Sequence, residues 1–120
     1  MTEFHKACVY GYGDLKFVKQ FIKNGNNIHE RNDKGMTGIL YACSAHKLTI
    51  VKMLINNGAN VDDENCDGLS CLFLACSSNS YDITKLLISY GANVNHKNRR
   101  GDSCLLVACL SNAYEYSKDL

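Results

Sequence analysis

The sequence predicts an all-α solenoid, in which helix–turn–helix units stack side by side and extended finger loops join them. Three observations support this prediction. Residue types recur every 33 positions, each unit contains two short apolar helical segments, and a glycine stands where each second helix would end. A unit of this kind has an apolar face that it cannot bury alone, so neighbouring units must stack.

Five ladders of identical residues define the repeat. Each ladder contains three residues separated by 33 positions. One period shared by five ladders indicates a structural repeat and not an accident of composition. The ladders are Asn32, Asn65 and Asn98; Gly35, Gly68 and Gly101; Ala42, Ala75 and Ala108; Cys43, Cys76 and Cys109; and Gly25, Gly58 and Gly91.

Each unit is expected to begin with a short capped helix. Thr37, Ser70 and Ser103 precede apolar runs, and hydroxyl side chains at such positions cap helix N-termini. A second run follows, with apolar residues at spacings of three and four that place them on one helix face. The glycine after this run suits the left-handed conformation that ends many helices. A polar stretch then forms the finger that leads into the next unit.

The period organises the chain as one domain. The first unit contains a two-residue insertion near Gly11-Tyr12-Gly13, and the last unit is incomplete. Two alternatives remain for the last unit: either the chain is a fragment of a longer array, or Tyr114–Leu120 forms a shortened terminal helix. An uncapped apolar edge there would promote self-association. The single domain of residues 1–120 divides into units at 1–32, 33–65, 66–98 and 99–120.

The composition favours a soluble protein of a reducing compartment, cytoplasmic or nuclear. Thirteen basic residues oppose twelve acidic ones, so no overall field directs the chain to nucleic acid or to an anionic membrane. The longest apolar stretch, Leu69–Cys76, is too short to span a bilayer. The first residues lack the apolar segment of a secretory signal. An odd count of seven cysteines argues against a disulfide scaffold.

The unit resembles the ankyrin repeat, which has a period of 33 and a first helix that opens with T-P-L-H-x-A. The second helix and finger resemble the family still more closely in Lys85–Asn95. Proline is absent from the motif, and Gly38 is its poorest replacement as a helix former. The matching segments are Thr2–Ala7, Thr37–Ala42, Ser70–Ala75 and Ser103–Ala108, of which only the first keeps the histidine, as His5.

The resemblance implies a protein–protein interaction module that is not an enzyme. Its partner would lie across the fingers and the concave face of the first helices. The alternative is a structural spacer or an assembly segment of a longer repeat protein. Met36 and Leu69 are expected to be exposed anchors, with packing against the next finger as the alternative. By repeat position, the implied contacts are Lys34, Met36, Ser44, Asp67, Leu69, Ser77, Arg100, Asp102 and Leu110. Arg99 joins these candidates through the basic charge of the third finger, described below.

Two further expectations concern origin and modification. Thirteen asparagines, and ten lysines against three arginines, are typical of AT-rich genomes such as those of large DNA viruses and intracellular parasites. In that case the partner would be a host protein. Asn95 follows Leu87 by eight residues and resembles ankyrin asparagines that asparaginyl hydroxylases modify.

The cysteines and histidines form no interpretable catalytic, metal or cofactor site. Cys66, Cys71 and Cys76 are five residues apart, whereas zinc ligands usually occur in more closely spaced pairs. The Cys43 ladder is separated by the stacking distance of roughly 8–10 Å between helices, which exceeds the reach of a disulfide at roughly 7 Å. We expect small buried residues, with Cys66 as an exposed thiol. The repeat scatters the four histidines along the stack, and none has a nucleophile at an interpretable spacing.

The fingers carry opposite charges. The second finger is acidic and contains no basic residue, whereas the third is basic. One interpretation is mutual attraction between exposed neighbouring fingers, which contributes little. The other is a bipolar rim that orients a partner of complementary charge. The acidic residues are Asp62, Asp63, Glu64 and Asp67, and the basic residues are Lys97, Arg99 and Arg100, with His96 beside them.

Overall fold

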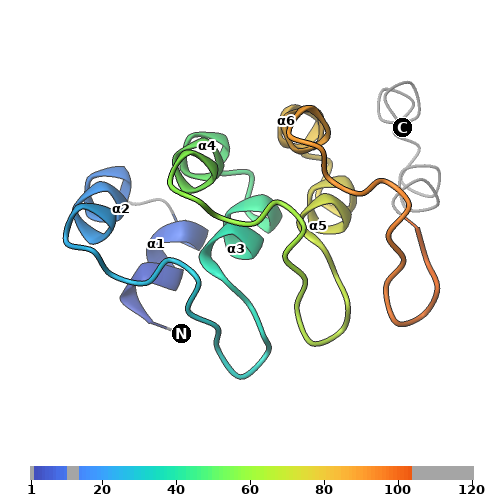
Figure 1. Ribbon diagram of the computed structural model, residues 1–120, viewed down its shortest axis with the longest axis horizontal. Coiled ribbons are helices and arrows are strands. Elements are labelled where there is room, and N and C mark those ends of the chain that lie inside the picture. The colour runs from blue at the N-terminus through green and yellow to red at the C-terminus, as the bar shows by residue number, and fades with distance from the viewer. Residues whose placement is uncertain (1, 11–13, 104–120) are drawn as a thin grey trace.

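The computed structural model describes residues 2–10 and 14–103. This part of the chain forms three helix pairs that stack along the longest axis of the molecule (Figure 1). Two isolated β-bridges are the only extended pairing in the described ranges, and both lie in the fingers. The predicted all-α repeat fold is therefore confirmed. The helices are α1 (Glu3–Tyr10), α2 (Asp14–Lys23), α3 (Gly38–Ser44), α4 (Leu48–Asn56), α5 (Cys71–Ser77) and α6 (Tyr81–Ser89).

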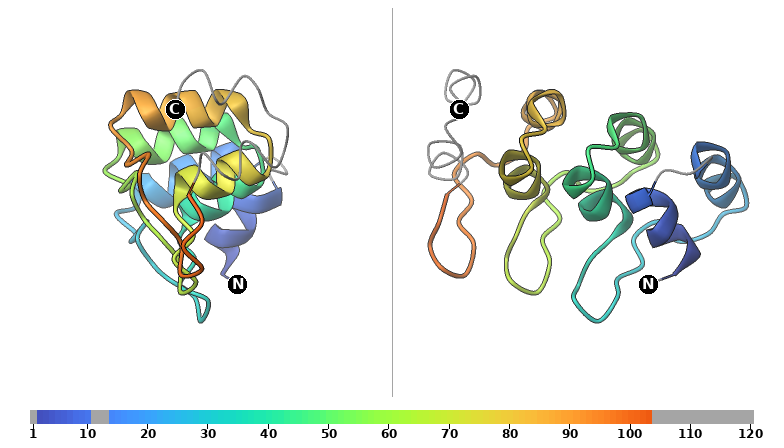
Figure 2. Two further views of the ribbon diagram at one scale, coloured as in Figure 1. Left: turned by 90° about the vertical axis from the view of Figure 1, so that its right-hand side faces the viewer. Right: turned by 180° about the vertical axis from the view of Figure 1, so that it is seen from behind.

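The helices form two layers, with the fingers beyond one of them. The first helix of each pair lies in one layer and the second helix in the other, as the rotated views show (Figure 2). The fingers extend past α1, α3 and α5, away from the layer of second helices. The fingers and first helices therefore form one side of the molecule. No helix within the described ranges is long and apolar enough to cross a membrane.

Local signals in the sequence begin and end the helices as expected. The Thr37 hydroxyl accepts a hydrogen bond from the Leu40 amide at 3.5 Å, and the Ser70 hydroxyl accepts one from the Phe73 amide at 3.1 Å. These bonds satisfy amides that have no partner within the first turn of a helix. Gly58 follows α4 with a φ of 95°, in the left-handed region that favours glycine.

The core lies between consecutive pairs. Residues at corresponding repeat positions, such as Leu54 and Leu87, are fully buried. The rings of Phe4 and Phe21 stack at 4.2 Å between α1 and α2. A Cβ atom at Gly38 would lie 2.6 Å from the Phe4 ring. The poor helix former at this position is therefore explained by the ring that packs over it.

Candidate functional site

The asparagine ladder shapes each fingertip. The Asn32 side-chain oxygen accepts hydrogen bonds from the amides of Lys34 and Met36, both at 3.0 Å. Asparagine side chains commonly stabilise turns by bonding to amides two residues further on. The same pair of bonds recurs in the next two fingers, from Asn65 to the amides of Asp67 and Leu69 and from Asn98 to those of Arg100 and Asp102.

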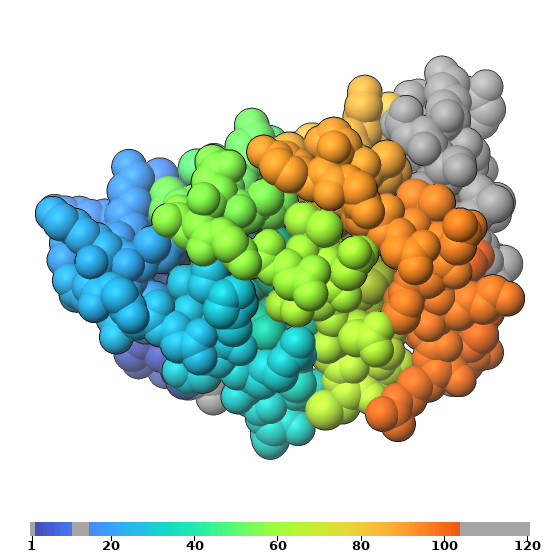
Figure 3. Space-filling model, viewed as in Figure 1, coloured from blue at the N-terminus to red at the C-terminus, as the bar shows by residue number. Residues whose placement is uncertain are grey.

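Backbone contacts join neighbouring fingertips. The Cys66 amide donates to the Lys34 carbonyl at 3.1 Å, and the Arg99 amide donates to the Asp67 carbonyl at 3.3 Å. A Cβ atom at Gly35 would lie 2.9 Å from the Cys66 amide nitrogen, so this close approach requires glycine. Neighbouring fingers are therefore hydrogen-bonded to one another and are not independent loops. The space-filling view shows them side by side (Figure 3).

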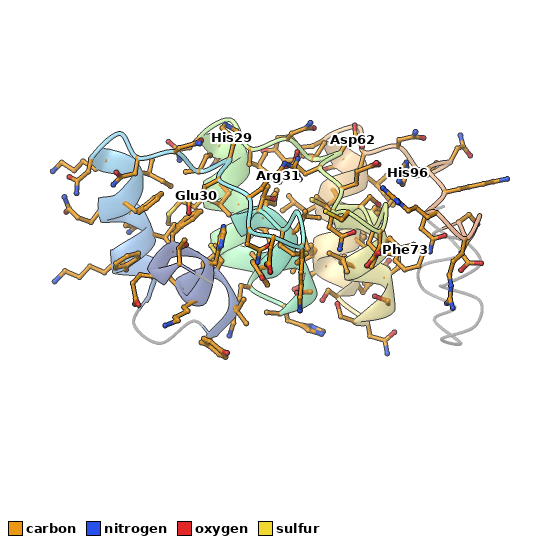
Figure 4. The ribbon with its side chains drawn as sticks, turned by 90° about the horizontal axis from the view of Figure 1, so that it is seen from below. His29, Glu30, Arg31, Asp62, Phe73 and His96 are labelled. Atoms are coloured by element: carbon orange, nitrogen blue, oxygen red, sulfur yellow. The ribbon has the colours of Figure 1, made fainter. Side chains whose placement is uncertain are left out.

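Two basic side chains tie the acidic second finger to its neighbours. From the first finger, Nη2 of Arg31 lies 3.3 Å from Oδ1 of Asp63. From the third finger, Nε2 of His96 lies 3.0 Å from Oε2 of Glu64 and 3.0 Å from the Gly68 carbonyl oxygen. Figure 4 shows Arg31 and His96 on the finger side of the molecule. The contact between Glu64 and His96 agrees with the predicted attraction between the second and third fingers. Asp63 does not, because it is buried and pairs with Arg31 of the first finger, a contact that the charge pattern did not predict.

The rest of the basic third finger is not used in this way. Lys97, Arg99 and Arg100 are exposed. Among residues 2–10 and 14–103, none of the three lies within 4.0 Å of a carboxylate oxygen. In the part of the chain that the structure describes, their charges are therefore unpaired.

A hollow of about 480 Å³ lies beside these arginines, between the second and third fingers and next to α5. Its apolar lining comes from Leu69 and Phe73, both partly exposed. Phe73, labelled in Figure 4, occupies the motif position that holds histidine in the ankyrin repeat. The hollow is lined by Asp67, Leu69, Phe73, Asn98, Arg99, Arg100 and Asp102.

Comparison with known families agrees with the fold and the period. The family model described as ankyrin repeats (three copies) matches residues 4–98 and, in a second match, residues 64–120. The chain belongs to the ankyrin repeat family. Ankyrin repeats are in general protein–protein interaction modules and are typically not enzymes. No curated protein sequence matches the chain significantly.

Five of the ten predicted contact residues meet in the hollow. Sequence reasoning missed Asn98 and Phe73, although Phe73 could have been found as the aromatic substitute for the motif histidine. The five predicted residues are Asp67, Leu69, Arg99, Arg100 and Asp102.

The expectation that Met36 is exposed is wrong. Met36 is only 8% exposed, and its sulfur accepts a hydrogen bond from the Asn65 side-chain amide at 3.5 Å. Methionine is flexible enough to fill irregular gaps, and here it packs against the second finger of the ankyrin array. The stated alternative, packing against the next finger, is therefore the correct one for Met36.

The remaining predicted contacts lie apart from the hollow. Lys34 is exposed on the first fingertip. The hydroxyls of Ser44 and Ser77 donate to Tyr41 and Leu74 carbonyls of their own helices, at 2.8 and 3.1 Å. Leu110 lies outside the described residues.

The described cysteines are buried apart from Cys66, as expected. One relationship among them was not predicted from the sequence. Interaction with the Cys43 thiol on α3, together with burial, raises the pKa of the Cys71 thiol on α5. Within the described ranges, no three histidine, cysteine or acidic side chains are placed to hold a metal ion.

Proposed function

We propose that this ankyrin array holds a partner protein on the side formed by its fingers and first helices. The supporting observation is the contrast between its finger arginines. Arg31 bonds to neighbouring groups of the array, whereas Arg99 and Arg100 border an open hollow with an apolar floor. Arginine beside a partly buried aromatic side chain is typical of the residues that dominate binding energy at protein interfaces.

Partner capture followed by kinetics tests the proposal. The folded domain would be used as bait in a pull-down, and a captured protein identified by mass spectrometry. Its association rate would then be measured with the Arg99→Glu/Arg100→Glu variant. Because charge at an interface mainly sets the encounter rate, we expect association to slow by about tenfold or more at low salt.

The matched control changes charge elsewhere by the same amount. Lys19→Glu/Lys23→Glu alters two exposed lysines on α2, in the layer of second helices. It should leave the association rate nearly unchanged. Equal slowing in both variants would indicate an effect of net charge alone, and unchanged association in the Arg99→Glu/Arg100→Glu variant would exclude the third finger from the interface.

A second candidate function is a stacking element that packs against further repeats or another copy. Phe17 on α2 is 41% exposed, whereas Ile50 and Ile83, at the same repeat position, are buried. Self-association through the C-terminal edge concerns residues outside the described part. Sedimentation over a range of concentrations would detect self-association. If the exposed surface at Phe17 on α2 is responsible, Phe17→Gln would abolish it. A concentration-independent monomer would exclude self-association.

A further inference from the structure

We infer that the hollow between the second and third fingers binds a partner segment in which an apolar side chain stands next to a single carboxylate. The inference presupposes the binding function proposed above and adds the chemistry of the partner.

The floor of the hollow selects an apolar side chain. Leu69 and Phe73 are partly exposed there. One repeat earlier the corresponding residues, Met36 and Leu40, are 8% and 0% exposed, and Met36 packs against the Asn65 side chain of the second finger. The partly exposed surface of Leu69 and Phe73 is the apolar area that a partner side chain would cover. Its volume of about 480 Å³ lies within the range of roughly 300–1,000 Å³ typical of ligand clefts.

The wall of the hollow selects a carboxylate. Arg99 and Arg100 line it, and no described carboxylate lies within ion-pair distance of either guanidinium. A guanidinium fork binds a carboxylate through two parallel N–H···O bonds, and such bonds are stronger when apolar groups nearby exclude water. Arg31, two fingers away, cannot serve in this way because its guanidinium already binds Asp63 and two carbonyls.

Two acidic residues of the lining limit how much negative charge the hollow accepts. Asp67 and Asp102 border the same space as the two arginines. These four side chains sum to zero formal charge, so a highly charged polyanion gains little there. One carboxylate can face the arginines while an apolar neighbour holds it away from the aspartates. Apolar burial then contributes much of the affinity, so binding should persist at moderate salt.

Peptide selection with defined variants tests the inference. Random short peptides displayed on phage would be selected on the folded array, and enriched peptides synthesised with a fluorescent label for anisotropy measurements. We expect enrichment of aspartate or glutamate adjacent to an apolar residue. Affinity should fall by about tenfold or more in Arg99→Ser/Arg100→Ser and in Phe73→Ala, as at interface hot spots.

Two further variants complete the test. Lys19→Ser/Lys23→Ser removes two exposed charges on α2, in the layer of second helices, and should change affinity less than about twofold, as expected outside a hot spot. Asp67→Asn should tighten binding, because it removes repulsion of the carboxylate. Circular dichroism and urea unfolding would establish whether each variant is folded. If Phe73→Ala does not fold, the Arg99→Ser/Arg100→Ser variant still tests the inference, because both arginines are exposed.

Several outcomes would overturn the inference. Enrichment of basic peptides, no enrichment at all, or equal affinity losses in Lys19→Ser/Lys23→Ser and the arginine variant would each do so. The binding function is judged separately by the pull-down. A captured protein that binds the hollow variants normally would leave that function standing while excluding the hollow.

Discussion

Arg31 and Asp63 form an ion pair between the first and second fingers, with Nη2 of Arg31 3.3 Å from Oδ1 of Asp63. The same guanidinium donates through Nη1 to the carbonyls of Gly35 at 2.7 Å and Glu64 at 2.8 Å. Asp63 is only 9% exposed, and a buried carboxylate depends on such partners. The Arg31 side chain is therefore part of the finger scaffold, whereas the guanidinium groups of Arg99 and Arg100 form no ion pair within the described part of the chain.

Arg31→Ala should lower the free energy of unfolding by about 1–3 kcal/mol, because Asp63 and two carbonyls lose a charged donor. Arg99→Ala provides the control, since that side chain is exposed and has no ion pair among the described residues. Its effect should stay within about 0.5 kcal/mol. Urea denaturation followed by circular dichroism measures both. Equal effects would contradict the scaffold role of Arg31.

The two helix caps should differ in their contribution to stability. Ser70→Ala removes the hydrogen bond to the Phe73 amide and should cost about 1 kcal/mol. Thr37→Ala removes the cap of α3 and also the hydrogen bond from the Thr37 hydroxyl to Oδ2 of Asp63 at 3.2 Å. The second loss leaves a buried carboxylate oxygen without this donor, so the total cost should reach about 2–3 kcal/mol. A smaller loss for Thr37→Ala than for Ser70→Ala in thermal unfolding would contradict this order.

Alanine substitutions at two glycines would separate backbone strain from close packing. Gly35 and Gly58 both have positive φ, 74° and 95°, so alanine should cost about 1 kcal/mol at each. At Gly35 the added Cβ would also lie 2.9 Å from the Cys66 amide nitrogen, whereas at Gly58 nothing lies within 4 Å. Gly35→Ala should therefore cost about 1–3 kcal/mol more, as overpacking does. Equal midpoints in urea would indicate that the fingertips can separate without penalty.

Stability should decline at alkaline pH through Cys71. Interaction with the neighbouring Cys43 thiol and burial raise the pKa of Cys71 above its ordinary value of 9.0. The folded state then keeps a proton that the unfolded state releases, so this contribution is complete below about pH 9 and is lost as the pH rises above it. The free energy of unfolding of the wild type should fall more steeply above pH 9 than that of Cys71→Ala. Parallel pH profiles would show that other groups control the alkaline slope.

Alkylation should distinguish the described cysteines in the folded protein. Cys66 is exposed, whereas Cys71 is buried and its raised pKa keeps the thiol protonated at neutral pH. Because the thiolate is the reactive form, iodoacetamide should modify Cys66 first and Cys71 only after unfolding. Peptide mass spectrometry after timed quenching measures the order. Early modification of Cys71 would show that the stack of α3 and α5 opens readily.

Features that depend on a single repeat could be predicted well. The capped helix starts at Thr37 and Ser70 and the glycine after α4 follow from local backbone chemistry, which the sequence displays directly. Of the seven residues that line the hollow, the ankyrin resemblance gave four and the charge of the third finger gave Arg99. Met36 could not be predicted in this way, since its burial depends on the flexible shape of one side chain against the finger of the next repeat.

By itself, the sequence determined the family, the order of helices and fingers, and the positions of the turns, because these depend on spacing and on the conformational preferences of a few residue types. The tertiary structure decided which side chains meet between units. It placed Arg31 on Asp63, His96 on Glu64 and the Cys43 thiol beside that of Cys71. Such pairs lie about one repeat apart, and side-chain size and direction select among several possible neighbours. The tertiary structure likewise brings Leu69 and Phe73 together with Arg99 and Arg100 around one hollow.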